Sequence, residues 1–120
     1  MISGNAARDG DPHRGWFVGQ FLPEGSPLKN PDIEVKWGIE PAGRTKASAG
    51  VNKVSKTLAI LIKGTFIMNV DGKEIVLKEP GDYVYHEAGE VHTWQAVTDC
   101  VVLTVRWPSV ADDQVRVSAD

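Results

Sequence analysis

Short apolar segments, each bounded by glycine, proline or polar residues, recur along the 120 residues of this chain. Apolar and polar positions alternate in residues 33–39 and 66–70, which is typical of half-buried strands. Residues 56–63 are mostly apolar and predict a strand that is buried on both faces. Asp71-Gly72 lies between two such segments and predicts a two-residue type I′ turn, because that turn needs positive φ at both central residues.

Further strand-like segments bring the expected number of strands to about eight, and no segment has the pattern of an amphipathic helix of useful length. These further segments are residues 15–22, 73–77, 83–86, 92–97 and 100–107. Residues 41–55 are small and polar and predict loop with short, weak strand, while Val115 and Val117 suggest an additional edge strand. Short strands joined by frequent turns indicate an all-β sandwich or barrel.

The ends of the chain set the expected domain boundaries. Residues 1–14 are polar without periodicity and predict a mobile or loosely docked arm. Residues 15–109 are expected to form one barrel domain, and residues 110–120 a polar tail. A chain of this length buries about two-thirds of its unfolded surface, which is enough for a single core.

Composition excludes several functional classes. The chain is 42% hydrophobic and 24% charged, and its net charge of −3 is scattered without a basic cluster, so nucleic acid is not an expected partner. No apolar stretch approaches the ~20 residues needed to cross a bilayer, and the N-terminus lacks the apolar core of a signal peptide. Cys100 is the single cysteine and cannot form an internal disulfide, which fits the expected cytoplasmic localisation.

Residues 81–94 hold the most informative pattern, in which two histidines lie at the two ends of one short, glycine-containing corner. Gly81, Gly89 and His92 match the glycine, glycine and histidine positions of G-x5-P-x-G-x2-H-x3-N. The segment therefore resembles the second signature motif of the cupins, although Glu87 replaces the proline and Ala96 the asparagine. The resemblance covers residues 33–107. Within the cupins, the chain is similar to a short bacterial subgroup with no settled activity. The resemblance implies an all-β, antiparallel cupin barrel, also described as a double-stranded β-helix or small jelly roll.

The first cupin motif, G-x5-H-x-H-x3/4-E-x6-G, has lost its ligands in this chain. Counting back from Gly64 places the glutamate position on Thr57, and the histidine positions fall on residues 52 or 53, or on residues 49 and 51, none of which is histidine. Of the four ligands that the resemblance implies, only His92 remains. Stable metal sites use three or four protein ligands, so we expect no metal cofactor at the usual cupin position.

The resemblance directs His92 and Trp94 into the barrel, because they share one face of their strand. His86 is expected near His92 across the corner, Trp37 and Trp94 are expected to form an apolar wall, and Thr57 is expected in the same pocket. His92 either contacts a bound molecule or is a structural remnant that is hydrogen-bonded inside the barrel. A divalent metal held by the two histidines and a carboxylate (Glu34, Glu40 or Glu87) is an alternative.

Arg106 and two glutamates are further charged groups whose positions bear on the site. Arg106 alternates with apolar residues, so it is either a buried cation that needs an acidic partner or ligand, or a surface residue. The surface position is the one that the sequence favours. Glu40 and Glu90 are expected to be solvated carboxylates in loops near the mouth of the barrel.

Three functional hypotheses follow. The first is a metal-free protein that binds a small molecule in the barrel cavity. The second is an enzyme, either a metal-dependent isomerase or oxygenase with a non-standard site at His86 and His92, or a metal-free acid–base catalyst that uses His92. The third is a non-catalytic structural or interaction barrel without a cavity. A homodimer that pairs through an edge strand is expected in each case.

Overall fold

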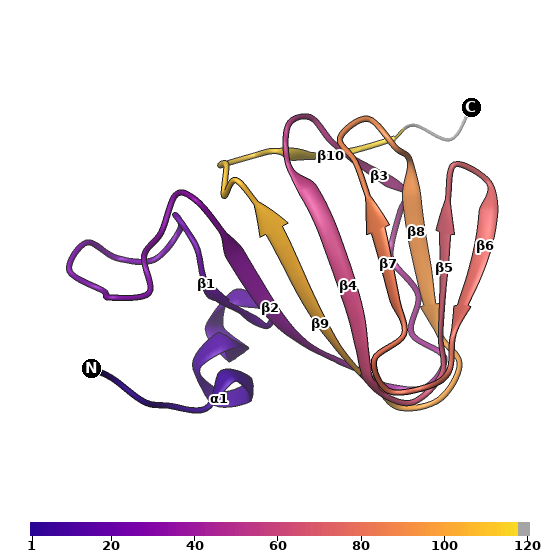
Figure 1. The fold of residues 1–120 in the computed structure, drawn as a ribbon, viewed down its shortest axis with the longest axis horizontal. Helices are drawn as coiled ribbons and strands as arrows, with labels where there is room; N and C mark the ends of the chain where they lie inside the picture. Colours follow the sequence, from indigo (N-terminus) through magenta and orange to yellow (C-terminus); the bar gives the residue numbers. More distant parts are fainter. Residues whose placement is uncertain (118–120) are drawn as a thin grey trace.

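A computed structural model describes residues 1–117 of the chain as two five-stranded antiparallel sheets that face each other (Figure 1). Sheet A has the strand order β1-β2-β9-β4-β7, with bounds Trp16–Val18, Glu34–Glu40, Cys100–Trp107, Lys56–Lys63 and Tyr83–His86. Sheet B has the order β10-β3-β8-β5-β6, with bounds Gln114–Arg116, Gly50–Asn52, His92–Ala96, Phe66–Val70 and Lys73–Leu77. The predicted all-β, antiparallel jelly-roll architecture is confirmed.

Local sequence explains most strand boundaries. Asp71 and Gly72 have φ of +49° and +82°, which confirms the predicted type I′ turn between β5 and β6. The short strands β3 and β10 lie in the two segments from which only weak or edge strand was expected, and they pair with each other. No helix within residues 1–117 is long and apolar enough to cross a membrane.

The N-terminal segment contains two helical turns, α1 (Ala6–Gly10) and the 3-10 turn Asp11–His13. The side chain of Asn5 accepts a hydrogen bond from the Arg8 backbone N–H, which caps α1. The turns lie beside β1 and β2 (Figure 1), so the predicted arm is docked at one edge of sheet A. Of the predicted tail, residues 118–120 lie outside the described residues.

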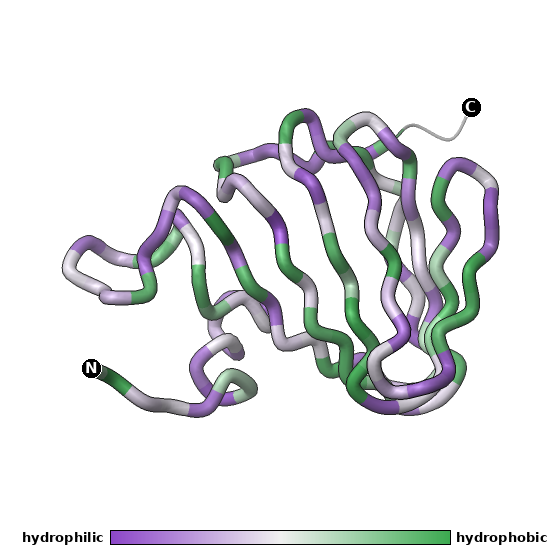
Figure 2. The backbone as a smooth tube through the Cα atoms, in the orientation of Figure 1, coloured by the Kyte–Doolittle hydropathy of each residue, from purple (hydrophilic) through white to green (hydrophobic). Residues whose placement is uncertain are grey.

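The core lies between the sheets, and its most buried members are Leu61, Ala96 and Leu77. Hydrophobic and hydrophilic positions alternate along the strands, as Figure 2 shows. In β4, Thr57, Ala59 and Leu61 are buried, whereas the alternate residues reach the surface. The prediction that β4 is buried on both faces is therefore wrong. Its apolar outer side chains meet no second layer among the described residues.

Candidate functional site

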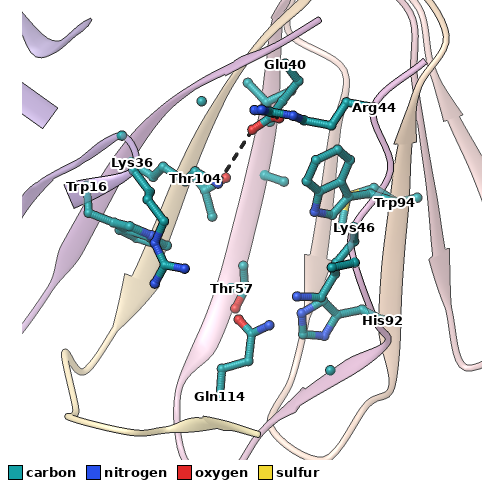
Figure 3. A pocket seen from close by; sticks show the side chains of 18 of the residues that line it. Trp16, Lys36, Glu40, Arg44, Lys46, Thr57, His92, Trp94, Thr104 and Gln114 are labelled. Atoms are coloured by element: carbon teal, nitrogen blue, oxygen red, sulfur yellow. Dashed lines mark hydrogen bonds and ion pairs between the residues drawn. The ribbon is translucent and has the colours of Figure 1, made fainter. Parts of the chain in front are cut away.

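A cavity of about 970 Å³ lies between the inner faces of the two sheets. Side chains from β2, β4, β7 and β9 of sheet A line one side, and side chains from β5 and β8 of sheet B line the other. Residues 44–50, β10 and the N-terminal residues 7, 11 and 14–16 also line the cavity (Figure 3). Ligand pockets in proteins commonly have volumes of about 300–1,000 Å³, so the cavity is large enough for a small molecule.

One cross-strand row of polar residues forms one end of this cavity. Thr57 is directly opposite Arg106 on one side and His86 on the other, so these three side chains are neighbours on the inner face of sheet A. His92 of sheet B stacks on His86, with ring centroids 4.3 Å apart. The prediction that the two histidines meet across the β7–β8 corner is confirmed.

The β7–β8 corner is held in place by backbone contacts. Gly89 has φ of +87°, a conformation that favours glycine, and its N–H donates to the carbonyl oxygen of Asn52. The N–H of Val91 donates to Asp71 Oδ1 at 2.7 Å. These contacts fix the start of β8, and the alternation of the strand then turns His92 inward.

Farther from this row, β5 and β8 line the cavity with apolar side chains, and the paired Glu40 and Arg44 lie beside Trp94 (Figure 3). Trp94 pairs with Met68 in register, and its ring stacks on Phe66 with centroids 5.2 Å apart. Ala59 and Val102 face them from sheet A. The cavity therefore has a polar end at the row Arg106–Thr57–His86 and an apolar wall made largely by sheet B.

Several buried polar atoms at the polar end have no hydrogen-bond partner among residues 1–117. They are Thr57 Oγ1, both ring nitrogens of His86, and Arg106 Nε. A buried polar group that loses its partner costs about 1–3 kcal/mol. Four such atoms on three adjacent residues indicate a place where a bound molecule supplies the missing partners.

Arg106 points into the barrel, so the surface position favoured from the sequence is wrong. One of its terminal nitrogens lies 3.4 Å from Glu34 Oε1, and the other donates to the side-chain oxygen of Gln114. Its guanidinium also lies 4.6 Å from the ring centroid of Trp16. One oxygen of Glu34 is thus paired with Arg106, and its second oxygen accepts a hydrogen bond from the Ser109 hydroxyl at 2.7 Å.

Glu40 is also not the solvated loop residue that the sequence suggests. It ends β2, is 6% exposed, and lies within ion-pair distance of both Lys36 (3.7 Å) and Arg44 (3.3 Å). Glu87, by contrast, lies at the surface beside the Tyr85 hydroxyl. The three carboxylates considered as metal ligands thus have other partners or point elsewhere.

Burial favours the neutral form of both histidines. Burial, followed by the proximity of His86, lowers the pKa of His92 to about 4. Burial also lowers the pKa of His86. Each neutral imidazole has one donor and one acceptor nitrogen, so the pair can offer hydrogen bonds to a ligand without a charge of its own.

The residues present do not fit the metal that the cupin resemblance implies. Within the described part of the chain, no group of three or more His, Cys, Asp or Glu side chains is placed to hold a metal ion. Among residues 1–117 the two histidines lack a third ligand. The nearby cation Arg106 lowers the pKa of both histidines, and Lys46 lowers that of His92. A metal cation bound at the two histidines would be repelled by the positive charges of these side chains.

Of the predicted pocket residues, His86, His92, Thr57 and Trp94 all line the cavity. Trp37 borders it too, but strand alternation puts its indole on the outer face of sheet A, opposite to Lys36 and Gly38. Sequence reasoning missed Lys36 and Lys46. The inward position of Lys36 follows from the alternation of β2, whereas Lys46 lies in a segment without periodicity and gave no signal.

No protein-family model matches the sequence, and no curated protein matches it significantly. Solved structures do match the fold. KdgF from Halomonas sp. has a TM-score of 0.65 at 16% identity, over 85% of this chain and 93% of KdgF. SPY1581, a conserved protein of unknown function from Streptococcus pyogenes, has a TM-score of 0.60 at 17% identity, over 70% and 71% of the two chains.

DMSP lyase DddQ from Ruegeria pomeroyi DSS-3 has a TM-score of 0.63 at 20% identity and matches 78% of this chain. The match covers 47% of DddQ, so this chain spans about half the length of that enzyme. At these identities the likeness concerns the fold alone. The fold of this chain is the cupin fold, as the sequence resemblance predicts.

Proposed function

We propose that this protein binds a small molecule in the cavity between its sheets, without the metal site that the cupin motifs imply. The observation that carries the proposal is the set of unpartnered polar atoms on Arg106, Thr57 and His86, which face a cavity with an apolar wall. Ligand sites combine these two features, because a few polar groups orient a ligand whose remaining surface is buried against apolar side chains.

A thermal-shift screen of the full chain against acidic, basic and neutral small molecules tests the proposal. A ligand at 100 times its Kd stabilises the folded state by about 2.7 kcal/mol, which raises the Tm by several degrees for a domain of this size. The shift is expected to be reduced in Thr57→Val, which removes one of these unpartnered polar atoms, and kept in His13→Asn, which alters a histidine outside the cavity. Equal shifts in both variants would place binding elsewhere and contradict the proposal.

The alternative of a metal-dependent enzyme has one observation in its favour, namely the adjacent rings of His86 and His92 with unpartnered nitrogens on His86. Elemental analysis of protein purified without a chelator or an affinity tag separates the two functions. We expect no stoichiometric zinc, iron, nickel or manganese, including after incubation with each metal. Near-stoichiometric metal that disappears in His92→Ala would replace our proposal by the enzyme.

We also infer that two copies of the chain pair through the outer face of sheet A, rather than through an edge strand. The outward side chains form two complete apolar rows across β2, β9, β4 and β7. They are Trp37, Leu103, Ile60 and Tyr83 in one row, and Val35, Val105, Leu58 and Tyr85 in the next. All of these side chains are at least partly exposed. Because no charged residue interrupts the rows, a second copy presents the matching apolar surface on a two-fold axis.

Light scattering of the purified protein tests this pairing. The expected result is a dimer for the native chain and for Val76→Glu on β6, and a monomer for Leu103→Glu. A native monomer at micromolar concentration, or a dimer that survives Leu103→Glu, would contradict the pairing.

A further inference from the structure

The side chains that line the cavity carry an excess of positive charge, although the whole chain has a net charge of −3. Six of them are basic and two are acidic. The basic residues are Arg14, Lys36, Arg44, Lys46, Arg106 and Arg116, and the acidic ones are Asp11 and Glu40. Clefts lined by one sign of charge concentrate the field and attract ligands of the opposite sign.

Part of this charge is balanced within the protein. Glu34 lies against Arg106, and Glu40 is shared between Lys36 and Arg44. Lys46 has no ion pair within residues 1–117. Figure 3 shows it extended into the cavity beside His92 and Trp94.

Lys46 is held among other cations. Burial, followed by the proximity of Arg106 and Lys36, lowers the pKa of Lys46. A half-buried ammonium group surrounded by like charges destabilises the protein when the cavity is empty. An acidic group on a bound ligand would pair with Lys46 and offset this cost.

We propose that the ligand is a small organic acid whose carboxylate lies beside Lys46 at the polar end of the cavity and whose apolar part packs against Trp94 and Met68. This inference rests on the proposed function and adds the chemical class of the ligand. The hydroxyl of Thr57 and a ring N–H of His86 supply the neutral hydrogen bonds to the carboxylate. The lysine supplies the charge, because a carboxylate is acceptor-only and binds ammonium groups with short, strong hydrogen bonds.

The two ends of the cavity require different parts of this ligand. The cationic end disfavours amines and metal ions, and neutral histidines beside it can donate hydrogen bonds without adding charge. The wall of Trp94, Met68 and Phe66 has one polar group, the indole N–H of Trp94, so an inorganic anion alone leaves most of that surface unused. An aromatic or short aliphatic carboxylate satisfies both ends.

The test uses the full chain and two matched pairs of probes, benzoate with benzamide and acetate with acetamide. Each pair has the same shape and differs in charge. Nitrogen-detected NMR of the histidine rings reports binding, because His86 and His92 border the proposed carboxylate position. We expect both acids to shift these resonances, benzoate at lower concentration than acetate, and both amides to leave them unchanged. Inorganic phosphate is expected to bind more weakly than benzoate.

Three variants test whether Lys46 supplies the positive charge that binds the carboxylate. Lys46→Met is expected to weaken benzoate binding about tenfold or more, because a hydrogen bond to a charged group contributes about 1.5–3 kcal/mol. Lys46→Arg is expected to keep the affinity within a few-fold. Lys73→Met removes an exposed lysine on β6 and serves as the control for the change in net charge. Circular dichroism confirms that each variant is folded.

The outcomes separate this inference from the proposed function. Equal binding of acids and amides would overturn the choice of ligand class and leave the cavity as a binding site. Absence of any shift with both acids would also overturn it, and the screen of neutral and basic compounds then decides the proposed function alone. Unchanged benzoate affinity in Lys46→Met would overturn the role of Lys46. Phosphate binding as tight as benzoate binding would overturn the role of the apolar wall.

Discussion

The inner faces of the two sheets present different chemistry to the cavity that they share. Sheet A contributes the polar row of Arg106, Thr57 and His86, together with Lys36 from β2. Sheet B contributes Trp94, Met68 and Phe66 from β8 and β5, together with the ionisable residues His92 of β8 and Arg116 of β10. Neither sheet alone makes the proposed ligand site, because the buried charged groups lie mainly on sheet A and the aromatic wall lies on sheet B.

Because of this difference, the inner face of sheet B is expected to contribute mainly to stability and that of sheet A mainly to ligand binding. The apolar side chains of sheet B bury surface in both the empty and the bound protein, so they should contribute mainly to folding. The polar row of sheet A keeps atoms without partners in the empty protein, so part of it should cost stability and serve binding. Substitutions on the two faces should therefore change stability and affinity in different proportions.

The largest effect is expected at Phe66 of sheet B. It is 4% exposed and stacks on Trp94, so Phe66→Ala should destabilise the protein by about 4 kcal/mol through lost burial and a new cavity. Urea unfolding measures the change, with Ile67→Ala on the other face of β5 as the milder control. A loss below about 1 kcal/mol would show that this part of sheet B is not a packed core.

On sheet A, Arg106→Met should destabilise the protein by about 3 kcal/mol, because it leaves Glu34 buried without its cation. The double variant Arg106→Met with Glu34→Gln should recover much of this loss, since no unpaired charge remains. Urea unfolding of the four proteins in this cycle gives the coupling. Additive effects of the two changes would contradict the buried pair.

The folded protein should lose stability in mild acid through His92. Its pKa is lowered to about 4 by burial and by His86, whereas an unfolded histidine titrates near 6.5. Between these values the unfolded chain binds a proton that the folded chain does not. This contribution to stability is therefore intact above pH 6.5 and lost as the pH falls towards 4.

The expected loss over this range is about 2 kcal/mol, reduced from the full shift because the ring borders the cavity. Urea unfolding at several pH values measures it. His92→Asn should show a shallower slope between pH 6.5 and 4. A variant with the same slope as the native chain would mean that His92 is not held neutral by the fold.

The smallest effect on stability is expected at Thr57. The sign of this effect shows whether Thr57 serves ligand binding or the stability of the fold. Thr57→Val removes a buried hydroxyl without a partner, so the empty protein should become more stable by up to about 1 kcal/mol, while benzoate binding weakens. Ser55→Ala is the contrast, because the buried Ser55 hydroxyl donates to the carbonyl oxygen of Pro108 at 2.6 Å and its loss should destabilise. Destabilisation by Thr57→Val, with unchanged binding, would assign Thr57 to the structure.

The sequence predicts the strands well where local pattern and turn chemistry agree. The predicted bounds of β4, β6, β7 and β9 are those of the structure, because each strand lies between serine, glycine, proline or charged residues. The helical turns of α1 were not expected. A five-residue helix carries too few turns to show a periodicity, and its position depends on contact with β2.

The candidate site was predictable only in part. The spacing of the cupin motif brings His92 into the barrel and His86 beside it. Alternation shows that Arg106 shares a face with Thr104, but it does not show which face is inside. The apolar residues Val101, Leu103 and Val105 suggested that their own face was the buried one, whereas it is the outer face of sheet A. Lys46 reaches the cavity through tertiary contacts that no local pattern records.

A crystal structure with 4-bromobenzoate, located by the anomalous signal of its bromine, shows directly where a bound acid lies. We expect bromine in the cavity against Trp94 and Met68, with the carboxylate within hydrogen-bond distance of Lys46 and Thr57. A carboxylate turned away from Lys46, or a cavity without the compound under conditions where it saturates the protein in solution, would contradict this expectation.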